Sequence, residues 1–528
     1  MPSFATTVPH RFIVAPMVGA SEPAFRILCR NYGADLCYSP MLPAHQLANP
    51  TFRQEHFSDT ELRILQPRND NDTKEESAAT TTITTPVVCH VSCNDPEEFA
   101  AAAVHAQAAG CVALDLNLGC PQRTAYVGQF GSYLLDDPDR IVRIVRAGVQ
   151  QSSRNRLPIT VKIRLLSTLQ ATIELCRQLC KVGVSLIAIH ARYRASWERK
   201  GPGARDGPAH LDQVAVIQKE LHREYPQVKI ITNGNTITWE DVQENLQQTQ
   251  ADGLMSAEGI LDRPALFLQR YGTDPERPVT VIRLSDKMRK LVTKLWTLAL
   301  KEVNTSKVDT KKRVKYNTKL QKSSSIALEQ ATVTLGSLLH TDQLQLAMEY
   351  LNLATVFPVP QRTAIFHTRR ILKELLSQYQ LLPECLACAT LDDLRRLLVQ
   401  VQHYQKNPAA FQYDTTKAAA EQQALERKRR EEGKRKEYEA RMIRKARREQ
   451  LPLDTYLKEG TELPTAALVQ QLQAMPRHEA LAIWKRNHKQ HCLALHLDGE
   501  CPRARTCAFL HVECPTANAF VETDAVAG

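Results

Sequence analysis

The sequence lacks any apolar run long enough to cross a membrane as a helix. Such a helix needs about 20 consecutive apolar residues, and every apolar stretch here is broken well short of that length. The opening residues, MPSFATTVPHRF, also lack the apolar core that follows a basic segment in a secretory signal. We therefore expect no membrane partner and a cytoplasmic location, with the nucleus as an alternative.

The sequence also lacks the cysteine density of a disulfide scaffold. Fourteen cysteines are spread through 528 residues, whereas disulfide-dense folds are short and secreted, so we expect reduced thiols or metal ligands. Hydrophobic residues make up 43% and charged residues 24%, which is ordinary for globular protein and excludes disorder throughout the chain. At about 100–200 residues per domain, the length allows roughly three or four compact units.

Acidic residues do not balance the basic ones. The formal net charge is +11, which suggests a polyanionic partner without naming it. Residues 421–450 hold 12 Lys and Arg against 7 Asp and Glu and predict a long charged helix, either a solvated linker or an RNA-contacting arm. Residues 301–322, with 8 basic and 2 acidic residues, predict a basic insertion or flexible loop. Residues 66–86 are polar and threonine-rich, which is typical of a disordered surface loop.

Short apolar, β-branched runs alternate with helical patterns through the first half of the chain. The runs that predict strands lie at residues 12–15, 34–39, 87–92, 112–116, 159–163, 186–190, 228–232 and 253–256. The patterns that predict helices lie at residues 21–31, 95–109, 137–149, 169–182, 211–224 and 239–248. Eight βαβ units in about 250 residues indicate an α/β fold, a (β/α)₈ TIM barrel. An open doubly wound sheet is the alternative, but the Gly-x-Gly-x-x-Gly turn that favours it is absent.

Polar, reactive and glycine residues gather where the predicted strands end. Barrel enzymes place their active sites at these carboxyl ends, so the pattern favours a ligand site. The residues concerned are Pro16, Met17, Val18, Asn117, Cys120, Lys162, Arg164, His190, Arg192, Asn233, Gly234, Asn235, Ala257 and Glu258. Lys162 stands within an apolar strand, where a charge needs an anionic or hydrogen-bonding partner. The turns after the last two strands are where barrels commonly bind a phosphate.

Several segments together resemble the tRNA-dihydrouridine synthases. They are APMVGASEPAFR, DLNLGCPQRTAYVGQFGSYLL, VKIRL, IHAR, TNGN and DGLMSAEGILDRPALF. The variant MSAEG near the eighth strand most resembles the eukaryotic synthase 1 group, the 16/17 synthases. The resemblance covers about residues 10–270 and continues more weakly through residues 348–376, which resemble the family's helical tRNA-binding domain. It implies an FMN-containing barrel that reduces the C5–C6 double bond of selected tRNA uridines with NADPH.

The resemblance also implies roles for individual residues. Those that would bind FMN are Pro16, Met17, Val18, His90, Lys162, His190, Asn233, Gly234, Asn235, Ala257 and Glu258. Asn117 and Arg192 would contact the uridine. Cys120 would be the general acid, because a hydride arrives at C6 and a donor on the opposite face must protonate C5. A thiol with the ordinary pKa of ~8.5 is protonated at neutral pH and can do this.

One of these residues departs from the family pattern. The family usually carries a glutamine on the third strand facing the flavin, and His90 occupies that place. An imidazole can still donate a hydrogen bond, but its charge state would influence the flavin potential.

Four residues near the C-terminus have the spacing of a zinc site. Cys492, Cys501, Cys507 and His511 follow the Cys-x₈-Cys-x₅-Cys-x₃-His pattern of CCCH zinc fingers. Three thiolates and one imidazole complete a tetrahedral Zn²⁺ site without an open position, so the metal would be structural. Phe509 and the basic residues of the same loop fit single-stranded RNA, with a protein-contacting finger as the alternative.

We therefore expect four regions. They are an FMN-binding barrel over residues 1–275, a helical tRNA-binding domain over 276–405, a charged helical linker over 406–455 and a C-terminal region over 456–528 with the finger at 492–511. The expected activity is the reduction of tRNA D-loop uridines to 5,6-dihydrouridine by a monomer that uses NADPH. Two alternatives are an FMN barrel that reduces a small molecule, as dihydroorotate dehydrogenases do, and a catalytically idle RNA-binding protein.

Overall fold

Two compact units make up the chain, Met1–Tyr413 and Asp414–Gly528. The computed structural model describes residues 8–57, 64–65, 82–83, 87–155, 157–194, 208–305, 308–321, 328–416, 426, 466–488 and 492–498. The predicted charged helix at 421–450 and the predicted loop at 66–86 lie outside the described residues, apart from residues 82–83 and 426.

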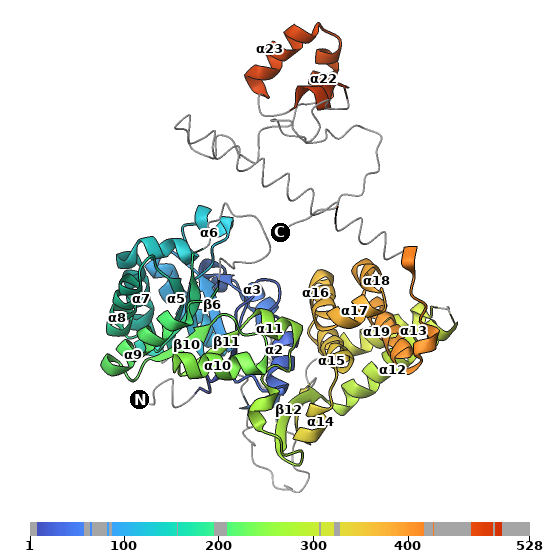
Figure 1. The fold of residues 1–528 in the computed structure, drawn as a ribbon, viewed down its shortest axis with the longest axis horizontal. Helices are drawn as coiled ribbons and strands as arrows, with labels where there is room; N and C mark the ends of the chain where they lie inside the picture. Colours follow the sequence, from blue (N-terminus) through green and yellow to red (C-terminus); the bar gives the residue numbers. More distant parts are fainter. Residues whose placement is uncertain are drawn as a thin grey trace. The chain divides into compact units, whose positions relative to one another are not determined.

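Eight parallel strands of the first unit close into a barrel (Figure 1). They are β1 (Phe12–Val14), β2 (Leu36–Tyr38), β6 (Val87–Ser92), β7 (Ala113–Leu118), β8 (Ile159–Leu165), β9 (Leu186–Tyr193), β10 (Lys229–Asn233) and β11 (Gly253–Ser256). Each strand pairs in parallel with the next of these in chain order, and β11 pairs with β1 to complete the ring. The predicted TIM barrel is confirmed, and the open sheet is excluded.

Helices follow the strands and cover the outside of the barrel. They are α2 (Pro23–Asn31), α5 (Pro96–Ala108), α7 (Pro138–Asn155), α8 (Leu169–Val182), α9 (Leu211–Glu224), α10 (Trp239–Thr249) and the short α11 (Glu258–Asp262). Local signals fix several ends. The Asp95 carboxylate caps α5 by accepting from the backbone N–H groups of Glu97 and Glu98, and α8 ends at Gly183, which has a φ of 109°.

Short elements complete this part of the chain. The strand β3 (Leu42–Pro43) pairs with the end of β6, and β4 (Ile64–Leu65) pairs antiparallel with β5 (Thr82–Ile83). The short helices are α3 (Pro50–His56) and α6 (Arg123–Val127), and the 3₁₀ turns are Ala44–Ala48, Gly131–Asp136 and Leu268–Tyr271. Within the described residues, no helix is both long enough and apolar enough to span a bilayer.

Alternate residues of the strands fill the inside of the barrel. One buried cluster joins Ile13, Tyr38, Val88, Ala188 and Ile231 from five different strands. Residues two positions further along the same strands face the same side. The packed interior therefore gives way to the side chains that follow it in sequence at the carboxyl ends of the strands.

Two antiparallel strands and two helices follow the barrel. The strands are β12 (Pro278–Leu284) and β13 (Leu328–Thr334), and α12 (Asp286–Thr305) and α13 (Thr310–Gln321) lie between them in the chain. The prediction of a loop over residues 301–322 is therefore wrong. Arg313 forms ion pairs with the buried Glu302 and with Asp392, and Leu320 is buried, so one face of α13 is anchored although its lysines are exposed.

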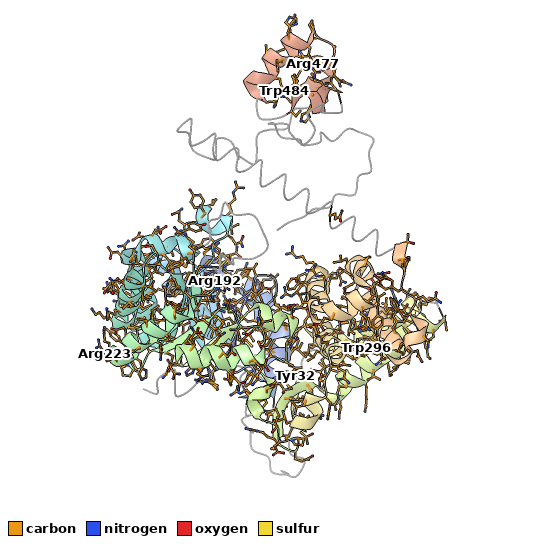
Figure 2. The ribbon with its side chains drawn as sticks, viewed as in Figure 1. Tyr32, Arg192, Arg223, Trp296, Arg477 and Trp484 are labelled. Carbon is orange, nitrogen blue, oxygen red and sulfur yellow. The ribbon has the colours of Figure 1, made fainter. Side chains whose placement is uncertain are left out.

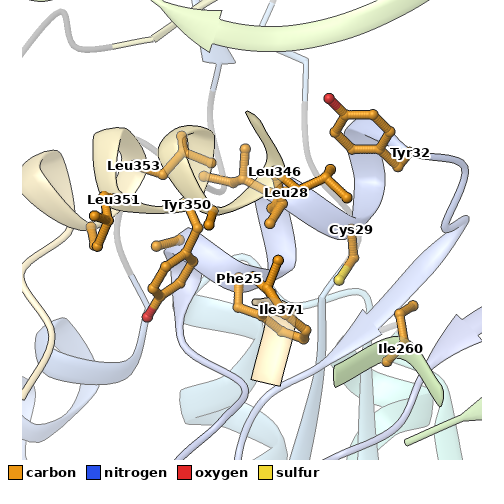
Figure 3. Close-up of a cluster of buried hydrophobic side chains, with 14 of the residues drawn as sticks. Phe25, Leu28, Cys29, Tyr32, Ile260, Leu346, Tyr350, Leu351, Leu353 and Ile371 are labelled. Atoms are coloured by element: carbon orange, nitrogen blue, oxygen red, sulfur yellow. The ribbon is translucent and has the colours of Figure 1, made fainter. Parts of the chain in front are cut away.

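Six further helices pack within the same unit. They are α14 (Leu335–Leu339), α15 (Gln343–Val356), α16 (Gln361–Ile371), α17 (Lys373–Gln378), α18 (Leu382–Ala387) and α19 (Leu391–Lys406). A 3₁₀ turn at Pro408–Ala410 follows them. Their apolar side chains share a core with α2, where Phe25 and Leu28 meet Tyr350, Leu351 and Ile371 (Figure 3).

A buried polar contact crosses the same boundary. Glu22, just before α2, accepts hydrogen bonds from the Tyr350 hydroxyl (2.8 Å) and from His367 Nε2 (3.1 Å). The His367 side chain is fully buried and stacks on Phe25 with ring centroids 4.2 Å apart. Burial alone would raise the pKa of the Glu22 carboxyl, but the charge and hydrogen bond of His367 hold it below its usual value. The barrel and the helices thus share a buried hydrogen-bonded pair as well as a core.

The described residues 466–498 of the second unit include three short helices, α22 (Ala466–Gln473), α23 (Arg477–Asn487) and α24 (Leu493–Asp498). Leu472, Ala480, Trp484 and Leu497 form a buried cluster between these helices (Figure 2 labels Trp484). Arg477 pairs with Asp498 and ties the start of α23 to the end of α24. Cys492 is buried at the start of α24, whereas Cys501, Cys507 and His511 lie outside the described residues.

Removing the Glu22 carboxylate should destabilise the first unit strongly. In Glu22→Ala, His367 stays buried without its acceptor, and breaking a buried pair from one side costs about 3 kcal/mol. Urea denaturation should show this loss in the free energy of unfolding. Glu374→Ala removes an exposed carboxylate on α17 and should change it by less than about 0.5 kcal/mol. Equal effects of the two substitutions would contradict the role assigned to Glu22.

Candidate active site

A cavity of about 310 Å³ opens at the carboxyl ends of the barrel strands. It collects side chains from β6, β7, β8, β9, β10 and β11 and from the segments that follow β1 and these strands. The sequence-predicted residues that line it are Pro16, Val18, His90, Asn117, Cys120, Lys162, Arg164, His190, Arg192, Asn233, Gly234, Asn235, Ala257 and Glu258. The structure therefore brings fourteen positions chosen from the sequence to one site.

Met17 is the one predicted barrel residue that does not line the cavity. Its side chain packs instead against the core shared with α2, and its backbone N–H donates to Ser21 Oγ (2.8 Å). Val18, the next residue, does line the cavity and is 74% exposed.

Three cations lie together in the wall of the cavity. Lys162 Nζ donates to Asn233 Oδ1 (3.1 Å), and Asn233 Nδ2 in turn donates to the Met255 carbonyl (2.9 Å). Burial, and then the charge of Arg164, lowers the pKa of Lys162 to about 8. Burial, and then the charge of Arg192, lowers the pKa of Arg164 to about 10. Because these cations destabilise one another, an anionic ligand would relieve an unfavourable arrangement.

The sequence reasoning assigned no role to Arg164. Its Nε donates to the Gly119 carbonyl (2.7 Å) and its Nη1 to the Tyr193 carbonyl (3.1 Å), so it supports the turn that carries Cys120. Positions two apart in a strand share a face. Since Lys162 was predicted to face the site, Arg164 could have been expected on the same face. Met41 also lines the cavity and lies two residues after the predicted strand at 34–39, but its apolar side chain carried no comparable signal.

Cys120 lies in a turn that is held from two sides. Asn117 Oδ1 accepts from the backbone N–H groups of Gly119 (2.9 Å) and Cys120 (3.1 Å). On the other side, the Cys120 carbonyl accepts from both the N–H and the hydroxyl of Ser132, each at 3.0 Å. A side chain at Gly131 would come within 2.7 Å of the Cys120 carbonyl, and its φ is +64°. These contacts fix the position of the thiol.

The thiol of Cys120 has the environment of a proton donor. It is half-buried, and burial raises its pKa, although the charges of Arg164 and Lys162 act in the opposite direction. The side chain is therefore a neutral thiol at neutral pH. Asn117 is placed as the residue that orients this turn, and its Nδ2 lies 2.7 Å from Met41 Sδ.

His90 is paired below the cavity. Its Nδ1 lies 2.6 Å from Asp115 Oδ2, and both side chains are almost fully buried. The Thr160 hydroxyl donates to the other oxygen of Asp115 (2.6 Å). With both its oxygens hydrogen-bonded, Asp115 fixes the His90 ring so that its opposite edge is the one available to the cavity.

The turn after β10 is a rigid backbone loop beside a cation. Asn245 of α10 donates to the Gly234 carbonyl (3.2 Å) and the Asn235 carbonyl (3.1 Å). Gly234 has a φ of +138°, and a side chain there would meet Ala209 Cβ at 2.9 Å. Arg192 donates to Asn235 Oδ1 and lies 3.1 Å from His190 Nε2 (Figure 2 labels Arg192). The loop and the guanidinium together suit a phosphate group.

The predicted zinc ligands are not brought together by the described residues. Cys492 belongs to the described second unit and its three expected partners do not. Within the described ranges, no three His, Cys, Asp or Glu side chains gather closely enough to hold a metal ion.

Comparison with known proteins supplies the family. Residues 13–332 match the family model described as Dihydrouridine synthase (Dus). The tRNA-dihydrouridine(16/17) synthase [NAD(P)(+)]-like protein of Rattus norvegicus is 35% identical over 258 residues, 49% of this chain and 51% of the relative. The 16/17 synthase of Schizosaccharomyces pombe is 35% identical over 256 residues, 48% of this chain and 57% of the relative. The 20a/20b synthase-like protein of Mus musculus is 30% identical over 257 residues, 48% of this chain and 68% of the relative.

The aligned part of the chain spans about half the length of the 16/17 synthases that it matches. The family match runs from β1 through the barrel to β13, and it includes every cavity residue described above. Since this match extends over more than half of the sequence, the chain belongs to the dihydrouridine synthase family.

Proposed function

We propose that this chain is an FMN-dependent enzyme that reduces selected uridines of tRNA to 5,6-dihydrouridine with electrons from NADPH. The observation that carries the proposal is the arrangement at the barrel mouth. A fixed, neutral Cys120 thiol lines the same cavity as three cations and the phosphate-suited turn at Gly234. A proton donor and an anion-binding wall are what a flavin-dependent reductase of an uncharged base requires.

The residues at the cavity fit FMN. The bare backbone at Gly234 and the guanidinium of Arg192 would hold its phosphate, and Lys162 with His90 would face its ring. The contacts of Arg192 with Asn235 and His190 support assigning Arg192 to the phosphate end instead of to the uridine. Bound FMN, once reduced by NADPH, would supply the hydride that C6 of the uracil accepts.

The chain's own residues would complete the reduction. Cys120 Sγ holds the proton that passes to C5, and Asn117 keeps the turn in place while it does so. Lys162 balances negative charge on the flavin side of the cavity. Pro16 and Val18, on the turn after β1, would exclude water from the space between the flavin and the base.

The similarity to relatives supports tRNA as the substrate. The 16/17 synthase-like relative shares 35% identity with this chain and the 20a/20b synthase-like relative 30%, which favours uridines 16 and 17. The net charge of +11 suits an RNA partner. We place the helical region in tRNA binding, and we expect a monomer in the cytoplasm or nucleus.

We also propose that Cys492, Cys501, Cys507 and His511 hold a structural Zn²⁺. The chemistry of the donor set supports this, because three thiolates and one imidazole satisfy tetrahedral zinc completely. The finger and the charged residues 421–450 would add affinity for RNA and would not take part in the reaction.

Purified full-length protein tests the proposed function directly. It should be yellow, with flavin absorbance, and should form dihydrouridine in bulk tRNA when NADPH is added. Reduction of orotate analogues without reduction of tRNA would favour the small-molecule reductase. Absence of flavin would favour the idle scaffold. Mapping dihydrouridine in tRNA from cells that lack the protein identifies the position that it reduces.

Replacing the thiol should separate binding from turnover. Cys120→Ala should retain FMN and tRNA but lose about 10²-fold or more in single-turnover rate, the usual contribution of general acid catalysis. Cys388→Ala, at the other cysteine that is half-buried among the described residues, is the matched control and should keep the wild-type rate. Wild-type turnover by Cys120→Ala would show that another group protonates C5.

Flavin affinity should depend on pH through Lys162. The ammonium is charged below a pKa of about 8 in the free protein, so affinity for anionic FMN should be full near pH 7 and should fall above pH 8. The fall should approach tenfold per pH unit at most. Quenching of FMN fluorescence measures it. Lys162→Met should bind more weakly and lose this dependence, whereas Lys181→Met, on the exposed face of α8, should keep it. An unchanged profile in Lys162→Met would exclude Lys162 from flavin binding.

A further inference from the structure

One face of α16 makes three polar contacts with the barrel. Thr363, His367 and Arg370 are spaced four and three residues apart, so they share a face of the helix. The Thr363 hydroxyl donates to the Gly19 carbonyl (3.3 Å), and His367 pairs with Glu22. Both contacts hold the segment after β1, which supplies Pro16 and Val18 to the cavity. Arg370, the third, reaches the segment after β11.

Arg370 binds that second segment at several points. Its Nη2 donates to Glu258 Oε2 (2.9 Å) and to the Glu258 carbonyl (3.0 Å). Its Nε forms an ion pair with Asp262 Oδ1 (2.5 Å), one turn further along α11. A single guanidinium therefore pairs with two carboxylates and also holds the Glu258 backbone carbonyl. A point charge such as that of lysine could not make these contacts together.

The position of Glu258 gives this contact its significance. Glu258 lines the same cavity as Gly234 and Asn235, where the proposed function places the FMN phosphate. A carboxylate near a phosphate repels it, and such like-charge contacts are costly unless they are compensated. Arg370 supplies that compensation from a helix outside the barrel.

We propose that Arg370 is a positioning residue of the flavin site, which cancels the charge of Glu258 and holds the turn after β11 so that the phosphate of FMN can bind. The inference rests on the proposed function for the identity of the flavin. It assigns α16 a role in cofactor binding in addition to its place in the helical region. Because coupling between sites is reciprocal, FMN should also strengthen the contact between α16 and the barrel.

FMN affinity of the flavin-free full-length chain tests the proposal. Arg370→Met should weaken binding by about tenfold, since it exposes the phosphate to an uncompensated carboxylate. Arg369→Met is the matched control, because its guanidinium lies over the Phe366 ring on the same helix, and it should bind FMN as the wild type does. The measurement is a titration of FMN fluorescence, which needs no turnover.

A second substitution distinguishes charge compensation from a purely structural role. If Arg370 acts by neutralising Glu258, then Glu258→Gln together with Arg370→Met should bind FMN within about twofold of Glu258→Gln alone. If the double variant stays as weak as Arg370→Met, the guanidinium only supports the fold and the proposal is overturned. Wild-type affinity in Arg370→Met would overturn it as well.

Two checks keep the outcomes separate. Near-ultraviolet circular dichroism without FMN should be the same for Arg370→Met and the wild type; if Arg370→Met does not fold, Arg370→Gln takes its place in the same comparison. A wild-type chain that binds no FMN would refute the proposed function itself. A wild-type chain that binds FMN while all variants bind equally well would refute only the role of Arg370.

Discussion

The concentration of positive charge at the barrel mouth is the constraint on which the rest of this structure depends. Lys162, Arg164 and Arg192 are held near one another, and burial, followed by the repulsion between neighbouring cations, lowers the pKa values of the first two. Backbone carbonyls and amide oxygens accept their hydrogen bonds without cancelling their charge. A closed barrel can hold such an arrangement because its strands fix each side chain from a rigid backbone.

The helices that follow the barrel support the site from outside. Glu22 and His367 join the two parts through a buried hydrogen bond, and the surrounding core extends from α2 into α15 and α16. The turn after β1 that lines the cavity and the helix α16 that holds it thus come from segments more than 300 residues apart in the sequence. The shared core and these contacts explain why the barrel and the helices form one compact unit.

Local patterns predicted the fold well, and contacts between distant segments did not follow from them. The bounds of α8 and α9 agree with the sequence because amphipathic spacing and the Gly183 stop are local signals. The helix α13 was missed because its support comes from Glu302 and from Asp392 on α19, 70 residues or more further along the chain. The cavity residues were found because a barrel gathers strand ends at one rim, whatever their separation. The ion pair of Glu258 with Arg370 could not be predicted in this way, because it forms only when α16 packs against the barrel.

Closure of the ring also decides how partners can be recognised. In an open sheet, the outer strands leave unpaired N–H and C=O groups that another chain can extend. Here β2 pairs with both β1 and β6, and β1 pairs with β11, so the eight barrel strands present no such border. The side chains of turns and helices must therefore supply the contacts to any macromolecule that binds the barrel. New binding preferences can then arise by substitution in those turns while the hydrogen-bonded ring stays unchanged.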